Sequence, residues 1–208
     1  MQPRSTDAIA ASLIRNLEAR TGLCLDEWIE ITAAECPALS GTGEDAPDPA
    51  SASHREVRRW LTSRYRLGPK TAWLIAAVAL RHLGGVDPSQ DEMVDEQYLG
   101  RYAPLRPVYD AIAFAARQLG DDVEIRPALT HVTLARGNTF AIVRPRLRAV
   151  RLGLRLPGGP AEPSERLVAQ PWMKGRVTHT IDLASIAEVD GEVQAWMRQA
   201  YQARGENA

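Results

Sequence analysis

Residues 123–156 of the chain read VEIRPALTHVTLARGNTFAIVRPRLRAVRLGLRL. Three runs of β-favouring residues in this stretch are separated by turn signals, and arginine recurs throughout. In the last run a valine and three leucines occupy the even positions from Val150 to Leu156, whereas Arg151 and Arg155 occupy odd positions. Because a strand points alternate side chains to opposite faces, this run predicts one apolar face and one basic face. A basic face of this kind is suited to an anionic partner.

The strands of this region predict the fold class of the second half of the chain. We expect strands over residues 123–126, 130–136, 139–144, 149–156 and 177–183. The turn signal Gly137-Asn138 between two of them is typical of a hairpin. A helix over residues 108–119 precedes the strands, and a capping box at Ser185 and Glu188 starts another after them. We therefore predict an α+β domain over residues 107–204, with a mainly antiparallel sheet flanked by two helices.

The amino-terminal part has helical periodicity instead. Apolar spacing predicts helices over residues 6–20, 26–35 and 70–83, and another that starts at residue 54. Asp26 is suited to cap the helix over residues 26–35, and Ser53 with Glu56 forms a capping box before the helix that starts at residue 54. Residues 40–53 are rich in Gly, Pro, Ser and acidic residues, so we expect a mobile loop there. Residues 1–85 are thus predicted to form an all-α four-helix unit.

Residues 86–106 are predicted to link the two parts. Asp87-Pro88 can begin a short acidic helix that reaches residue 99 at most. Beyond it, Gly100, Pro104 and Pro107 are expected to prevent regular structure. We therefore place the domain boundary in this segment.

Composition bears on the compartment in which the chain works. No apolar run approaches the roughly 20 residues that cross a bilayer, and the first residues lack the apolar core of a signal peptide. The two cysteines, Cys24 and Cys36, lack a second pair with which to build a zinc site and are expected to be reduced thiols. We predict a cytoplasmic protein with no membrane partner.

The formal net charge of −1 hides a strong segregation of charge along the chain. Residues 1–52 carry three arginines against nine carboxylates. Residues 53–82 carry six arginines and Lys70 against Glu56 alone, and residues 120–180 carry ten basic groups against five acidic ones. Because regional charge governs steering and the choice of partner, the two basic segments are candidates for binding an anion.

Short motifs give the chain a resemblance to two families of domains of unknown function. The amino-terminal part resembles domain-of-unknown-function family 4287 through TGLCLDEWI at 21–29, SHRE at 53–56, WL at 60–61 and LGPKTA at 67–72. The carboxy-terminal part resembles domain-of-unknown-function family 5655 through PVYDA at 107–111, THV at 130–132, FA at 140–141, LGL at 152–154 and TH at 178–179. The resemblance implies a fold and a pairing of two domains, but no activity.

The turn LGPKTA at residues 67–72 is also similar to the second half of a helix-hairpin-helix motif. In that motif the hairpin amides and the next helix amino terminus bind a DNA phosphate without reading sequence. Lys70 is expected at the phosphate, and nearby arginines add positive charge: Arg58, Arg59, Arg64 and Arg66. Arg66 stands where the motif has an earlier glycine. The alternative is a tight corner between two helices of a small bundle.

A second candidate site is the basic hairpin near the end of the opening stretch. Its arginines are Arg144, Arg146, Arg148, Arg151 and Arg155. Two roles compete for them, which are contact with phosphates and pairing with carboxylates of the acidic amino-terminal part. In the alternative without a binding role, these arginines are only exposed to solvent.

A third candidate is a pocket in the carboxy-terminal domain. His131 and His179 lie on different predicted strands and could meet across the sheet, while the loop at residues 172–176 carries Trp172 and Lys174. An aromatic beside cations could clamp an anionic planar ligand by stacking and charge. The alternatives are two structural histidines and a tryptophan that plugs the mouth of the sheet. No third metal ligand and no nucleophile pattern accompanies them, so neither a metal nor a catalytic residue is predicted.

Two functions from different classes follow. The preferred hypothesis is a non-catalytic binding protein for an anionic partner, nucleic acid in the first place, with contacts from Arg58, Arg59, Arg66, Lys70, Arg151 and Arg155. The alternative is a small-ligand-binding protein or enzyme with a pocket near His131, Trp172, Lys174 and His179. Neither requires a cofactor. In a third possibility the two domains pair through opposite charges and present a protein-binding surface.

Overall fold

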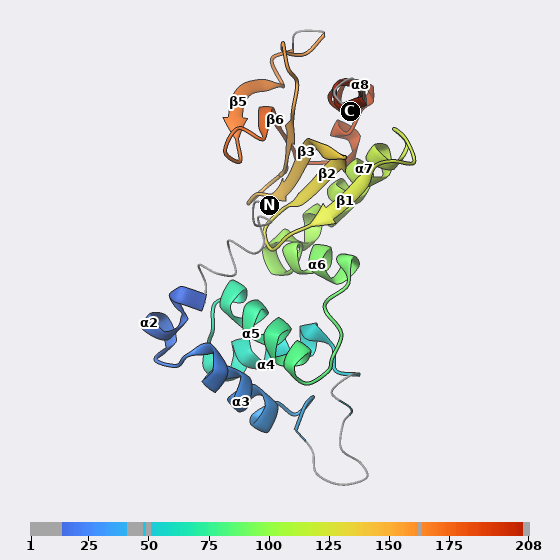
Figure 1. Cartoon of the computed structure of the whole chain (residues 1–208). Coiled ribbons are helices and arrows are strands. Elements are labelled where there is room, and N and C mark those ends of the chain that lie inside the picture. Colours follow the sequence, from blue (N-terminus) through green and yellow to red (C-terminus); the bar gives the residue numbers. More distant parts are fainter. Residues whose placement is uncertain (1–13, 41–47, 49–50, 162–163, 206–208) are drawn as a thin grey trace. The chain divides into compact units, whose positions relative to one another are not determined.

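The computed structural model describes residues 14–40, 48, 51–161 and 164–205 (Figure 1). The chain divides into two compact units, Met1–Glu92 and Met93–Ala208. A helical region is followed by a six-stranded antiparallel sheet with flanking helices, so the predicted α+β fold class is confirmed. Of the predicted helix over residues 6–20, residues 6–13 lie outside the described part, as does most of the predicted loop 40–53.

The amino-terminal unit contains the helices α2 (Leu17–Thr21), α3 (Leu25–Glu35), α4 (His54–Tyr65) and α5 (Pro69–His82). α4 begins at the predicted capping box, in which the Glu56 amide donates to Ser53 Oγ at 3.2 Å. α3 begins earlier than predicted, because the Glu27 carboxylate accepts a hydrogen bond from the Cys24 amide at 2.7 Å. Cys24, and not Asp26, is therefore the capping residue of α3.

One apolar core holds these helices together. Its largest fully buried side chains are Leu17 from α2, Leu61 from α4, and Ile75 and Leu80 from α5. Burying a side chain of this size contributes about 1.5–3 kcal/mol relative to leaving it exposed. Leu67, which lies between α4 and α5, belongs to the same core. The turn between these two helices is thus anchored from inside.

The predicted linker is more regular than expected. It contains α6 (Gln90–Gln97) and the 3-10 helix η1 (Gly100–Leu105), and α7 (Arg106–Arg117) follows directly. Pro104 lies inside η1 and Pro107 lies in the first turn of α7. The expectation that Gly100, Pro104 and Pro107 prevent regular structure was therefore wrong. The first turn of a helix has no acceptor for its amides, so a proline there loses no hydrogen bond.

The carboxy-terminal unit is organised around its sheet. Its strands are β1 (Glu124–Pro127), β2 (Val132–Arg136), β3 (Asn138–Pro145), β4 (Val150–Leu154), β5 (Val168–Trp172) and β6 (Val177–Leu183). Their order is β1-β2-β3-β4-β6-β5, and every neighbouring pair is antiparallel. The sequence did not predict β5. That strand pairs only with β6, contains Pro171 and is mostly exposed, so it lacks an alternating pattern.

The register separates the two faces of the sheet. On one face Leu134, Val143 and Leu152 share a core with Ile112 of α7 and Met197 of α8 (Gly191–Gly205), and both helices flank the sheet (Figure 1). We call the opposite side the second face. Two rows of paired positions cross it: Thr133, Ile142, Gly153 and Thr180, and beside them Arg144, Arg151 and Asp182.

The final helix starts later than predicted. Ser185 Oγ and the Ala184 amide do contact the Glu188 carboxylate, but they stabilise only the short 3-10 helix η2 (Ile186–Glu188). Asp190 instead accepts the Val193 amide at 3.1 Å and caps α8. The predicted capping box therefore lies one short turn before the helix that it was expected to start.

Candidate functional sites

Arg151 is paired within its own sheet. Its Nε donates to Asp182 Oδ1 and its Nη2 donates to Asp182 Oδ2, both at 2.7 Å. The neighbouring even positions Val150, Leu152 and Leu154 are fully buried, so the predicted alternation of this strand is confirmed. The hydrogen bonds from Arg151 hold the pKa of Asp182 below its usual range. The expectation that Arg151 presents an uncompensated charge was therefore wrong.

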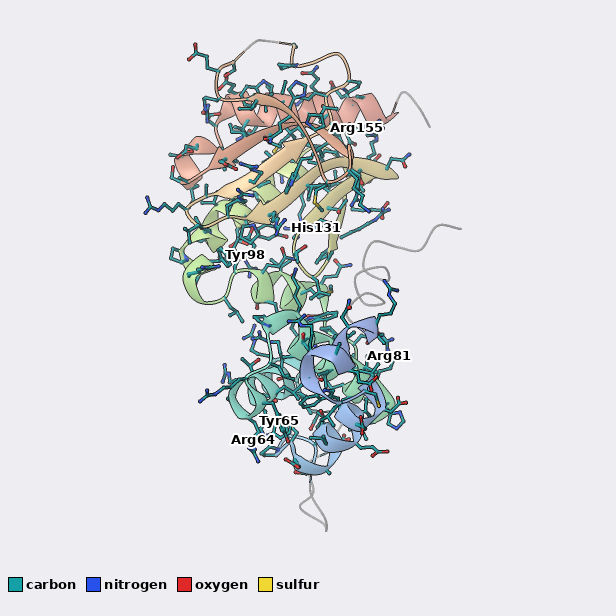
Figure 2. All side chains as sticks on the ribbon, turned by 90° about the vertical axis from the view of Figure 1, so that its left-hand side faces the viewer. Arg64, Tyr65, Arg81, Tyr98, His131 and Arg155 are labelled. Carbon is teal, nitrogen blue, oxygen red and sulfur yellow. The ribbon has the colours of Figure 1, made fainter. Side chains whose placement is uncertain are left out.

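Arg155 lies at the end of the same strand. Its Nη1 lies 3.4 Å from the carbonyl oxygen of Gly175, in the turn between β5 and β6 (Figure 2). That contact restrains the side chain without neutralising its charge. Arg155 is half-buried. The two arginines that the sequence grouped together thus have different surroundings.

A different group of cations gathers on the second face. Arg176 Nη2 donates to Thr139 Oγ1 at 2.9 Å and lies 3.4 Å from Thr133 Oγ1. His131 is buried close by (Figure 2). Its burial, together with the charges of Arg176 and Arg144, lowers its pKa to about 4. At neutral pH His131 is therefore uncharged and Arg144 and Arg176 carry the positive charge.

The four residues of the predicted pocket are distributed over several strands. His131 directly precedes β2, and His179 lies on β6, with β3 and β4 between these strands. His179 Nδ1 lies 2.9 Å from Thr178 Oγ1. Trp172 lies against Gly153, where an added Cβ would come within 2.9 Å of the indole. Lys174 is exposed in the β5–β6 turn with a φ of 59°.

The corner between α4 and α5 has an unusual backbone. Arg66 ends α4 in the left-handed region, with a φ of 53°, at the position where the helix-hairpin-helix pattern has a glycine. Gly68 is the N-cap of α5 and Pro69 follows in its first turn. Gly68 has no side chain to cap the helix and Pro69 has no amide N–H, so the amides of Lys70 and Thr71 are the ones available to an external acceptor.

A cavity of about 400 Å³ lies beside this corner. Its lining includes two arginines, two aromatic rings and the start of α5: Arg20, Thr21, Leu23, Trp28, Tyr65, Arg66, Leu67, Gly68 and Thr71. A Cβ added to Gly68 would lie 4.0 Å from Arg20 Nη2, which places that guanidinium at the amino end of α5. The rings of Trp28 and Tyr65 pack edge to face, 5.0 Å apart between their centroids.

The charges around this corner are largely uncompensated. Arg20, Arg66 and Lys70 are exposed, and none forms an ion pair with another residue that the structure describes. Arg59 is exposed too, and Arg64 lies over the Tyr65 ring at 5.3 Å (Figure 2). Arg58, by contrast, is half-buried and has an interaction partner within the chain. We call Arg20, Arg66 and Lys70 the corner cations.

Sequence reasoning did not find the contribution of α2 and α3 to this site. Arg20 and Trp28 are far in sequence from Arg66 and belong to no shared motif. The helices meet only through their common core, so no local pattern predicts the cavity. The one usable signal was the helix end at Gly22, which places Arg20 in the last turn of α2.

The comparisons with known proteins concern mainly the carboxy-terminal unit. The family model described as domain of unknown function DUF5655 matches residues 94–204, which is more than half of the chain. The chain belongs to the DUF5655 family. The predicted resemblance to family 5655 is therefore confirmed, and the DUF5655 domain contains the whole sheet with α7 and nearly all of α8. No match to family 4287 was found. No curated protein and no solved structure matched the chain.

Two further observations concern the described residues as a whole. None of their helices combines the length and the apolar character needed to cross a bilayer. Within residues 14–40, 48, 51–161 and 164–205, no three His, Cys, Asp or Glu side chains gather as a metal site requires.

Proposed function

We propose that the protein binds nucleic acid through the sugar-phosphate backbone, without catalysis, at the corner between α4 and α5. The observation that carries the proposal is the cavity in which Arg20 and Arg66 flank the uncapped amino end of α5. Phosphate oxygens accept charge-assisted hydrogen bonds from guanidinium groups and from helix amides. Such contacts hold the backbone in place and do not read sequence.

The aromatic wall of the cavity favours a nucleic acid over a simple inorganic anion. A cavity of about 400 Å³ exceeds the space that a single phosphate needs and is in the range of small-ligand sites. Tyr65 is half-buried there and its hydroxyl is held by Glu35 at 2.7 Å, which fixes the orientation of the ring. A sugar or an unstacked base can pack on such a ring while the arginines hold the adjacent phosphate.

The contact set differs from the one that the sequence suggested. Arg59, Arg66 and Lys70 remain in it and Arg20 is added, because all four side chains are exposed. Arg151 leaves the set, since Asp182 already neutralises it. Part of the same proposal is that the amino-terminal unit represents family 4287 and that the protein works in the cytoplasm, where nucleic acid is present.

A fluorescence-anisotropy titration of a short labelled DNA duplex with the full chain tests this proposal. Four phosphate contacts, from Arg20, Arg59, Arg66 and Lys70, predict a slope of about −3.6 for log K against log salt. Affinity should then fall about 150-fold between roughly 50 and 200 mM salt. A duplex of scrambled sequence should bind equally well. Absence of binding at the lowest salt would remove the proposal.

A further inference from the structure

The second face of the sheet contains an arginine whose contacts are all neutral. Arg176 is half-buried, and its Nη2 contacts the hydroxyl oxygens of Thr139 and Thr133. No carboxylate of the described residues forms an ion pair with it. Burial alone accounts for the lowered pKa of Arg176, which means that no acid offsets the desolvation of its charge.

Arg144 is in a similar position on the same face. It lies directly opposite Arg151 in the register of β3 and β4, and Arg151 lies opposite Asp182 in that of β4 and β6. Both oxygens of Asp182 accept a hydrogen bond from Arg151, and the ion pair of Asp182 is with that arginine and not with Arg144. Within the described part of the chain Arg144 forms no ion pair of its own, although like charges placed opposite each other in a sheet repel.

His131 connects these two arginines. His131 precedes Val132, which pairs with Val143, the residue before Arg144, and Arg176 contacts Thr133 two residues after His131. The charges of both arginines accordingly act on the buried His131 ring. The hydroxyl of Thr130 is 3.3 Å from His131 Nδ1, and no acidic group contributes to this environment. A partly buried cluster of cations without an acid is costly unless an anion accompanies it.

The hairpin of β5 and β6 closes one side of this region. An added Cβ at Gly153 would come within 2.7 Å of Val177 Cγ2 and 2.9 Å of the Trp172 ring, so glycine is what allows the hairpin to lie on the second face. The turn that follows β5 carries Arg176 and brings its side chain to Thr133 on β2. Arg176 is therefore held against the sheet by contacts to both β2 and β3.

We propose that the second face of the DUF5655 domain binds the phosphoryl group of a small phosphate monoester between Arg144 and Arg176. A carboxylate has two oxygens, and one guanidinium fork satisfies both of them, as the pair of Arg151 and Asp182 shows. Two guanidinium groups, those of Arg144 and Arg176, match the three oxygens and the larger charge of a phosphoryl group. The hydroxyls of Thr133 and Thr139 orient Arg176 for this contact.

Titration of the full ¹⁵N-labelled chain with inorganic phosphate, followed by NMR at constant ionic strength, tests the proposal. Saturable shifts are expected for the Arg144 and Arg176 side-chain Nε–H signals and for the amides around His131 and Thr139. Arg176→Gln should weaken phosphate binding about tenfold or more, because a charge-assisted hydrogen bond is lost. Arg148→Gln, at an exposed arginine of the β3–β4 turn, is the matched control and should leave binding unchanged.

A second measurement separates ligand binding from a structural role of Arg176. Arg176→Met should raise the melting temperature of the ligand-free protein, because it removes a partly buried charge that no acid compensates. If Arg176 only cross-links the strands through its threonine contacts, the same substitution lowers the melting temperature and phosphate causes no saturable shift. Equal affinity for acetate and phosphate would overturn the phosphoryl assignment.

This site is independent of the proposed nucleic-acid contact. Arg66→Gly alters the amino-terminal unit and should leave the phosphate shifts on β2 and β3 unchanged. Unchanged DNA binding by Arg66→Gly, with those phosphate shifts retained, would contradict the proposed function alone. Shifts confined to the corner cations would contradict the present proposal alone.

Discussion

Arg151 on β4 and Asp182 on β6 form a two-point ion pair across neighbouring strands, with both N–O distances at 2.7 Å. Each carboxylate oxygen of Asp182 accepts one hydrogen bond from Arg151, and the two opposite charges make the pair net neutral. The alternating pattern of β4 predicts a basic surface, but at Arg151 the basic side chain pairs with a carboxylate of the same sheet. Among the arginines without an ion pair to another described residue are Arg20 and Arg66 at the α4–α5 corner and Arg144 and Arg176 near His131.

A double-mutant cycle with Arg151→Met and Asp182→Asn measures this pair. The geometry is bidentate and Arg151 is largely shielded, so the coupling free energy should be about 1 kcal/mol, at the upper end of the range for surface pairs. Urea unfolding of the four proteins gives the value. Arg151→Met should also bind DNA as the wild type does, and a loss of affinity in that variant would return Arg151 to the contact surface.

Arg66→Gly should stabilise the protein. Arg66 adopts a φ of 53°, a conformation that costs a residue with a Cβ roughly 1 kcal/mol and costs glycine little. The free energy of unfolding should therefore rise by about 0.5–1 kcal/mol. Arg59→Gly is the control, because Arg59 lies inside α4, where glycine should destabilise by about 1 kcal/mol. Equal loss of stability in both variants would contradict the left-handed conformation of Arg66.

Two buried tyrosines should respond to loss of their hydroxyl in opposite ways. Tyr98 Oη is buried and has no hydrogen-bond partner among the residues that the structure describes, and burial raises the pKa of Tyr98 (Figure 2). Tyr98→Phe should therefore stabilise the protein by about 1 kcal/mol. Tyr201 Oη donates to Asp122, so Tyr201→Phe should destabilise it. The melting temperatures of both variants test these predictions. A lower melting temperature of Tyr98→Phe would mean that the Tyr98 hydroxyl has a hydrogen-bond partner.

Acid should destabilise the protein through His131. Its folded pKa of about 4 is lower than the ordinary value of 6.5, so its contribution is present above pH 6.5 and is lost as pH falls toward 4. The full loss is on the order of 3 kcal/mol. Unfolding measured across this window should show a shallower pH dependence for His131→Gln than for the wild type. Some dependence will remain, since burial also lowers the pKa of His54.

The exposed His82 provides the control for that experiment. His82→Gln should reproduce the wild-type pH profile. If His131→Gln shows the same profile too, the histidine is not buried as a neutral group in the folded state.

Much of the fold could be predicted because its signals are local. The parity of Val150 to Leu156, the turn at Gly137-Asn138 and the capping box at Ser53 each depend on a few adjacent residues. β5 could not be predicted, because an exposed edge strand that contains Pro171 has neither alternation nor strong β propensity.

The candidate sites were harder to predict, because they depend on pairings between distant residues. Asp182 meets Arg151 only because β6, and not β5, is the neighbour of β4. Arg20 reaches the corner only through the packing of α2 beside α5. The sequence did indicate the corner itself, since the Gly68-Pro69 turn and the position of Arg66 are visible in it.

The affinity of the full chain for a labelled DNA duplex, measured by anisotropy over a series of salt concentrations for the wild type and Arg66→Gly, tests the central claim most directly. Binding at the corner predicts that the substitution lowers affinity about tenfold at low salt and reduces the salt slope by about 0.9, although it stabilises the fold. An unchanged affinity and slope in Arg66→Gly, or no binding by the wild type at low salt, would contradict the account.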